Sequence, residues 1–186
     1  VEGKPVYYWV DRQDLTIPID AGYVALVNCI NMTAQNLNLT KNGQGILLAF
    51  TENSTISGNN IVNNYEGIFL YMASNNILFG NDITANDYCG IYLGASSNNI
   101  LFGNDITAND DYGIYLYPYA SNNRIYHNNF IDNGYQAHIA YGVNMWDDGY
   151  PSGGNYWSDY DGLDVYSGPY QNETGSDGRG DNPYII

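Results

Sequence analysis

A repeat of 22 to 23 residues constrains the fold of this chain more than any other feature. The fourteen residues SNNILFGNDITAND occur at 74–87 and again, without a single difference, at 97–110. A Gly-Ile-x-Leu cluster recurs with them, beginning at Gly45, Gly67, Gly90 and Gly113. Periods between about 20 and 50 residues are typical of stacked units that each contact their neighbours along the chain. The sequence therefore predicts a solenoid.

Each repeat contains three short bursts of alternating apolar residues, a pattern of strands rather than helices. One unit holds Ile77-x-Phe79, Ile83-x-Ala85 and Ile91-x-Leu93, separated by the turn-forming residues Gly, Asn and Asp. Three strands and three turns per repeat predict an all-β fold, a right-handed parallel β-helix (solenoid) of about six rungs with an irregular C-terminal cap. A leucine-rich repeat has a similar period but needs a helical segment, and no helical periodicity occurs here.

The repeat also predicts how the chain is divided. Residues 1–16 are expected to form an N-terminal strand or cap, and residues 17–133 the β-helix repeats of 22–24 residues. Residues 134–186 are expected to form a Gly-, Tyr- and Asp-rich cap or intersubunit segment. Val1 indicates a processed or truncated start.

Aligning the repeats assigns side chains to columns that run along the solenoid. The expected inward columns are Ile56, Ile77, Ile100 and Ile125; Ile61, Ile83, Ile106 and Phe130; and Ile46, Ile68, Ile91 and Ile114. His127 is expected to point inward with Phe79 and Phe102, at the end of the core. One bend collects Asn59, Asn81, Asn104 and Asn128, whose stacked amides can hydrogen-bond along the column.

Outward positions predict two exposed apolar stripes. Leu47 begins a stripe with Phe69, Tyr92 and Tyr115, and the other consists of Leu78, Leu101 and Tyr126. Exposed stripes of this kind often form interfaces. Two interpretations remain open: sugar rings stack on the aromatic side chains, or another subunit or the C-terminal segment packs over them.

Charge excludes some partners and leaves a catalytic site without support. The chain has 20 acidic and 5 basic residues and a net charge of −15, so nucleic acid is not an expected partner. No apolar run reaches the roughly 18 to 20 residues that membrane insertion requires.

Asp82 and Asp105 fall on adjacent rungs, where water, a shared proton or a cation would relieve their repulsion. Carboxylate pairs here lack basic companions, so no catalytic residue is assigned and the chain is expected not to be an enzyme.

The two cysteines cannot bond to each other in this register. Cys29 and Cys89 lie about three rungs apart, roughly 14 Å, which exceeds the limit of about 7 Å between the Cα atoms of a disulfide. Either each forms an intermolecular disulfide, with Cys89 in an exposed turn, or both are buried thiols.

Two further sets of residues suggest modification and metal binding. Sequons predict glycosylation at Asn31, Asn38, Asn53 and Asn172. The tail is rich enough in oxygen ligands to be a candidate Ca²⁺ site, and no other cofactor is expected. Its carboxylates are Asp159, Asp161, Asp164, Asp177 and Asp181.

The tail also carries a specific resemblance. Together with the NNI and GI-x-L repeats, the segments NNFIDNGYQA (128–137), WDDGYPSGGNYWSDYDG (146–162) and DGRGDNPY (177–184) resemble archaeal NosD-like β-helix surface proteins, especially those of methanogens. Residues 165–176 interrupt the family's usual pattern. The resemblance implies a β-helix within a wider group of carbohydrate-binding and sugar-hydrolase proteins. Copper delivery, which the family name suggests, would need His127, His138, Met145 and Cys89 to converge, but they fall on different units.

These features lead to two functional hypotheses. The first is a structural protein of an extracellular cell-surface layer, filament or sheath, which assembles with itself into a homo-polymer. Its contacts would be the stripes, the cysteines and the β-prone ends YYWV (7–10) and PYII (183–186). The alternative is a polysaccharide-binding or polysaccharide-cleaving β-helix protein whose partner is a cell-surface polysaccharide. A cleft with a carboxylate pair and a basic residue would favour the alternative.

Overall fold

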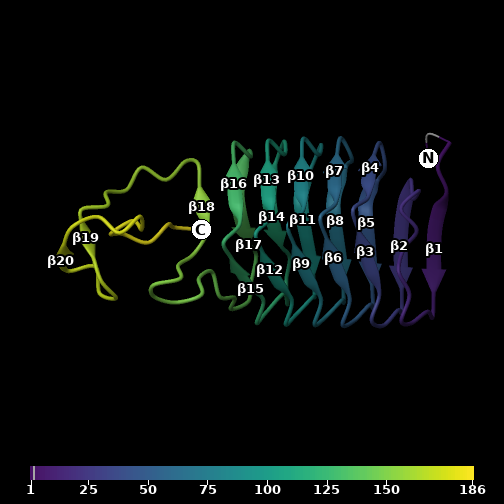
Figure 1. Ribbon diagram of the computed structural model, residues 1–186, viewed down its shortest axis with the longest axis horizontal. Helices are drawn as coiled ribbons and strands as arrows, with labels where there is room; N and C mark the ends of the chain where they lie inside the picture. The colour runs from purple at the N-terminus through teal and green to yellow at the C-terminus, as the bar shows by residue number, and fades with distance from the viewer. Residues whose placement is uncertain (2) are drawn as a thin grey trace.

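Three parallel sheets stack into a β-solenoid in the computed structural model, which describes residues 1 and 3–186. Figure 1 shows the rungs side by side along one axis, with the tail extending beyond the last rung. No helix forms among the described residues, and none could therefore cross a membrane. The predicted all-β parallel solenoid of about six rungs is confirmed.

A complete rung contributes one strand to each sheet, and the three sheets contain seven, five and six strands. Sheet 1 contains β1 (Val6–Val10), β2 (Tyr23–Val27), β5 (Gln44–Ala49), β8 (Glu66–Tyr71), β11 (Cys89–Gly94), β14 (Tyr112–Leu116) and β17 (Tyr135–Ile139). Sheet 2 contains β3 (Thr33–Gln35), β6 (Thr55–Ser57), β9 (Ile77–Phe79), β12 (Ile100–Phe102) and β15 (Arg124–Tyr126). Sheet 3 contains β4 (Asn38–Thr40), β7 (Asn60–Val62), β10 (Asp82–Thr84), β13 (Asp105–Thr107), β16 (Asn129–Ile131) and β18 (Tyr156–Trp157). In the tail, β19 (Tyr166–Ser167) and β20 (Glu173–Thr174) form an antiparallel pair.

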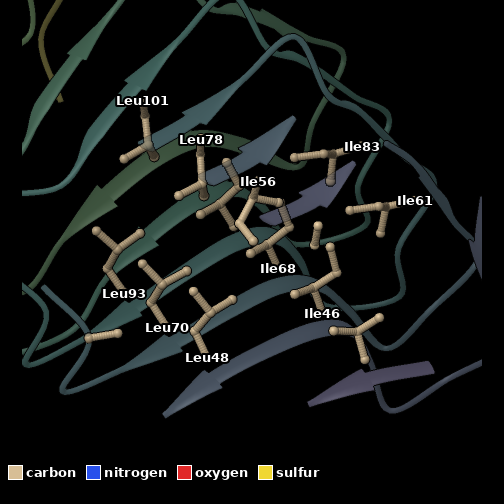
Figure 2. Close-up of a cluster of buried hydrophobic side chains, with 14 of the residues drawn as sticks. Ile46, Leu48, Ile56, Ile61, Ile68, Leu70, Leu78, Ile83, Leu93 and Leu101 are labelled. Carbon is tan, nitrogen blue, oxygen red and sulfur yellow. The ribbon is translucent and has the colours of Figure 1, made fainter. Parts of the chain in front are cut away.

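The core confirms two of the three predicted columns and corrects the third. The Ile46 and Ile61 columns are buried in register, but β9 and β12 are shifted by one residue, so that Ile56 pairs with Leu78 and Leu78 with Leu101. Figure 2 shows these two leucines among the core side chains. All three positions of β9 and β12 are apolar, so alternation alone could not identify the inward residue. The predicted exposed positions of Leu78 and Leu101 are therefore wrong.

His127 is also placed differently from the prediction. It occupies an exposed turn with a φ of 55°, not the core. Phe79 and Phe102 point outward and stack, with their ring centroids 5.2 Å apart, and Tyr126 extends the ladder at 5.9 Å. The second exposed stripe thus consists of Phe79, Phe102 and Tyr126.

Buried asparagines close the backbone at the corners between sheets. Asn81 is typical: its Oδ1 accepts from the backbone N and the Nδ2 of Asn59, at 3.1 and 2.9 Å. Its Nδ2 donates to the Ile56 carbonyl at 3.0 Å and to Asn104 Oδ1 at 2.8 Å. The predicted column from Asn59 to Asn128 is confirmed, and two further ladders occur. These are Asn76, Asn99, Asn123 and Asn144, and Asn42, Asn64, Asn86, Asn109 and Asn133.

The glycine of each Gly-Ile-x-Leu cluster allows neighbouring rungs to approach closely. A Cβ on Gly90 would lie 2.7 Å from the Gly113 carbonyl oxygen and 2.8 Å from Ile106 Cγ2. Because carbon atoms do not approach backbone oxygen this closely, a larger residue would push the rungs apart. The repeated glycine is explained by this contact.

Segments of the tail cover the C-terminal end of the core. Trp157, in β18, stacks on Phe130 with a centroid distance of 4.6 Å and on Tyr184 at 4.4 Å. Trp146 packs against Trp157 at 5.8 Å. The GNYWSDY and NPY segments therefore cap the solenoid, as Figure 1 shows for β18 beside β16.

Replacing one ladder asparagine should strongly destabilise the fold. Asn104→Ala would leave the buried Asn81 amide and Leu78 carbonyl without partners, and each such group costs about 1–3 kcal/mol. We expect the free energy of unfolding to fall by about 2–5 kcal/mol in urea denaturation. Asn60→Ala removes an amide from an exposed position and should change it by less than about 0.5 kcal/mol. Equal losses would contradict a structural role of the ladders.

Candidate functional site

Aromatic side chains cover the outer surface of sheet 1 and its adjoining turns over five rungs. Their rings contact one another within and between rungs, at centroid distances of 4.7–6.5 Å. We call this set the aromatic face. It consists of Phe50, Tyr65, Phe69, Tyr71, Tyr88, Tyr92, Tyr112, Tyr115, Tyr117, Tyr135 and His138.

One column of the aromatic face follows directly from the strand register. Phe69, Tyr92, Tyr115 and His138 are paired across β8, β11, β14 and β17. Successive centroid distances are 4.7, 5.4 and 4.9 Å, close to the strand spacing of about 4.8 Å. Phe69, Tyr92 and Tyr115 thus stack on the outer surface as the repeat predicted.

Sequence reasoning missed a second outer column. It precedes the repeated glycine and runs through Gln44, Glu66, Cys89, Tyr112 and Tyr135. The Cβ of the glycine would point toward the core, so the preceding residue points outward. The recurrence of this position every 22 or 23 residues was the signal that could have identified it.

A carboxyl group and a thiol of this column are buried beneath the rings. Glu66 is 8% exposed and accepts a hydrogen bond from Gln44 Nε2 at 3.0 Å, while Cys89 is fully buried. Burial raises the pKa of Glu66. Burial, followed by the charges of Glu66 and Asp111, raises the pKa of the Cys89 thiol.

The phenol groups of Tyr88 and Tyr92 remain neutral at physiological pH. Burial raises the pKa of Tyr88 to about 12, and the neighbouring Tyr115 contributes. The pKa of Tyr92 is raised to about 12 by the same two effects. Neutral phenols can both donate and accept hydrogen bonds along this surface.

The cysteines are positioned as buried thiols. Cys29 lies in register with Thr51, and its Sγ contacts the Val27 and Trp9 carbonyl oxygens. Both thiols are free and have no exposed surface, and Cys89 lies in β11 instead of the expected exposed turn. A disulfide to another chain would require the rung that holds the cysteine to open. The structure therefore favours the alternative of two buried thiols.

Carboxylates of the tail are engaged in local hydrogen bonds and do not form the expected Ca²⁺ cluster. Asp164 accepts from Ser176 Oγ and from the backbone amides of Asp177 and Gly178, and these bonds lower its pKa. Asp181 accepts from two backbone amides, and Asp159 from the Tyr184 hydroxyl. Within residues 1 and 3–186, no three His, Cys, Asp or Glu side chains are grouped to hold a metal.

Other predicted positions lie on the surface without forming a further site. Asp82 and Asp105 are paired in register and exposed, and Asp105 accepts from Asn129 Nδ2 at 2.6 Å. The sequon residues Asn31, Asn38, Asn53 and Asn172 are all exposed.

A cleft of about 940 Å³ lies between the last rung and the tail. It contains His127, Asp147, Asp181 and Arg179, and so has the carboxylates and basic residues expected of the polysaccharide hypothesis. However, both faces of Trp157 are covered by other rings, and Asp181 is engaged by backbone amides. The aromatic face, whose rings are partly exposed, is therefore the stronger candidate for binding.

Comparison with known proteins identifies one family and one group of structures. Residues 19–162 match the family model described as periplasmic copper-binding protein (NosD). No curated protein matches the chain.

Solved structures of one enzyme, the periplasmic alginate epimerase AlgG, share the fold. One has a TM-score of 0.56 and 20% identity, over 79% of this chain and 36% of that chain. A mutant form gives 0.55 and 18% over 75% and 46%, and a double mutant 0.51 and 23% over 75% and 40%. The chain thus spans less than half the length of these structures, and the likeness shows the fold.

The expectation that this chain is not an enzyme is corrected by these comparisons. Its fold is shared with an alginate epimerase, and the cleft beside the tail brings carboxylates together with basic residues, so the lack of such a constellation in the sequence pattern is no ground for excluding catalysis. Identities of 18–23% show that this chain shares the fold of the enzyme, but they do not show that it shares the reaction.

Removing the charge of Glu66 should stabilise the protein at neutral pH. The folded pKa of Glu66 is raised above its ordinary value of 4.5, so its contribution is fully present below about pH 4.5 and is lost as pH rises through the folded pKa. Glu66→Gln should therefore raise the urea midpoint at pH 7 relative to the parent and leave it nearly unchanged at pH 4. Asn60→Ala, an exposed control without an ionisable group, should give the same difference from the parent at both pH values. A Glu66→Gln effect independent of pH would contradict the burial argument.

Proposed function

This chain belongs to the NosD family, and we propose that it binds polysaccharide outside the cytoplasm through the aromatic face. The observation that carries the proposal is the column Phe69, Tyr92, Tyr115 and His138, whose rings follow one another along the solenoid axis. A polymer lying along that axis would meet a ring at every rung. Its repeating units would thus match a repeating surface.

The chemistry of the aromatic face suits sugar rings. The C–H groups on the face of a sugar ring pack against aromatic rings, while tyrosine hydroxyls hydrogen-bond at the edges. Tyr65, Tyr117 and Tyr135 are each at least half exposed and leave ring surface for a ligand. The fold shared with an alginate epimerase supports a polysaccharide partner.

Location outside the cytoplasm is supported by the comparisons. Both the family and the solved structures are described as periplasmic. We extend this to the cell surface, where a polysaccharide partner would be encountered.

Copper, which the family description names, does not suit the residues present. The exposed His127 contacts Ser152, whereas His138 stacks on Tyr115 and Cys89 is buried beneath the rings. The described residues contain no group of three or more His, Cys, Asp or Glu side chains for a metal. The proposal therefore includes no copper chemistry.

Self-assembly into a surface layer, filament or sheath is a second candidate. It rests on β1, the edge strand of sheet 1, whose Val6, Tyr8 and Val10 are 55%, 60% and 42% exposed. A strand from a second copy could pair with this edge. Because both thiols are buried, this candidate function includes no intermolecular disulfide bonds.

Blocking the edge of β1 tests self-assembly. In sedimentation velocity, the parent protein should shift to larger species as concentration rises, and a Val6→Lys and Val10→Lys double variant should stay monomeric, because edge lysines oppose strand pairing. Leu163→Lys and Val165→Lys add the same charge to exposed tail positions and should assemble like the parent. A parent that stays monomeric at every concentration would refute this candidate.

Shortening two rings tests polysaccharide binding. Tyr92→Ala with Tyr115→Ala should weaken binding to a retained polysaccharide by about 5- to 150-fold, because each lost stacking contact contributes about 0.5–1.5 kcal/mol. Binding is measured by affinity electrophoresis in gels that contain the polysaccharide. Phe79→Ala with Phe102→Ala removes two stacked rings from sheet 2 and should leave binding unchanged. Equal retention of both double variants would exclude the aromatic face, provided both unfold at the parent's temperature.

A further inference from the structure

The distribution of charge around the aromatic face defines the class of polymer it can bind. Resting on the function proposed above, we propose that its ligand is an uncharged polysaccharide, without the carboxylate or sulfate groups of acidic polymers. An acidic polymer such as alginate, whose sugar units are uronic acids, is therefore not the proposed ligand.

Lys and Arg are missing from the four central strands of sheet 1, and Lys41 lies in the turn before the first of these strands. Residues 42–123, which include β5, β8, β11 and β14, contain no Lys or Arg. Arg124 lies in sheet 2, where it pairs with Asp148 at 2.6 Å, and Arg179 lies over the Tyr150 ring in the tail. Recognition of a sugar carboxylate characteristically uses paired Arg N–H groups or a Lys ammonium. The aromatic face offers neither.

Acidic side chains instead follow one margin of the aromatic face. Asp87, Asp110 and Asp111 are exposed in the turns that lead into β11 and β14. Asp111 is close enough to influence the Cys89 thiol electrostatically, which places its charge beside the outer column of sheet 1. Asp132 occupies the corresponding turn one rung later.

The exposed carboxylates in the turns before β11, β14 and β17 would repel an acidic polymer at three successive rungs. The negative charges of the polymer and of these turns would face each other along the axis, so their repulsions would add. Salt screens such interactions over about 8–10 Å at physiological ionic strength. The same carboxylates can accept hydrogen bonds from the hydroxyl groups of an uncharged sugar. The margin therefore favours neutral polymers and opposes acidic ones.

Comparing polymers of different charge tests this inference. The intact chain is run through gels containing laminarin, an uncharged glucan, or alginate or polygalacturonate, at 20 and 200 mM salt. We expect laminarin to retain the protein equally at both salt concentrations, and the two acidic polymers to bind at least about tenfold more weakly at 20 mM salt. Stronger or equal binding of the acidic polymers would overturn the inference while preserving polysaccharide binding. Retention by none of the polymers, or retention unaffected by Tyr92→Ala with Tyr115→Ala, would overturn the proposed function and this inference with it.

A charge-matched pair of variants locates the effect. Asp110→Asn with Asp111→Asn removes two charges beside the aromatic face. At 20 mM salt, this double variant should reduce the ratio of the affinity for laminarin to the affinity for alginate by about threefold or more. Asp82→Asn with Asp105→Asn removes two exposed charges from sheet 3 and should leave the difference unchanged. Equal effects of the two pairs would assign any discrimination to net charge alone, contradicting a role for the margin.

Discussion

Hydrogen bonding at the corners of each rung is the constraint on which this fold depends. A chain that turns three times in 22 or 23 residues leaves backbone amides and carbonyls at every corner, where no sheet can pair them. Asparagine satisfies both kinds of group, because its oxygen accepts from the preceding rung and its nitrogen donates to a carbonyl and to the next amide, as at Asn81. Three such ladders hold successive rungs in register. The sequence is rich in asparagine because the backbone requires it.

The fixed register determines what happens on the outer surface. Once the ladders and the apolar core align the rungs, any outward position becomes a column with a spacing of about one strand. Aromatic residues then stack whether or not they stabilise the fold, as Tyr92 and Tyr115 do. The burial of Glu66 and Cys89 is a consequence of this packing, since the surrounding rings exclude water from groups that point away from the core.

Much of the architecture could be predicted from the sequence, because the repeats of one chain can be aligned with one another. The period gave the parallel solenoid, and alternation identified the Ile46 and Ile61 columns. Alternation failed at Leu78, where Ile77, Leu78 and Phe79 are all apolar and the neighbouring asparagines decide the register instead. The sequence left the burial of Cys89 as one of two alternatives, because the rings that cover it come from other rungs. The capping contact of Trp157 with Phe130 depends on how the irregular tail returns to the last rung.

Differences among the rungs separate structural from functional positions. The core column at Ile46 repeats isoleucine at Ile68, Ile91 and Ile114, because each must fill the same space. The outer column changes from Gln44 and Glu66 to Tyr112 and Tyr135, although the backbone places no such demand on it. An outward position that changes to an aromatic residue between one rung and the next reflects a requirement other than folding. The aromatic face is richest in tyrosine at the rung of β14, with Tyr112, Tyr115 and Tyr117, and this rung is where the proposed contact with a polymer would be most extensive.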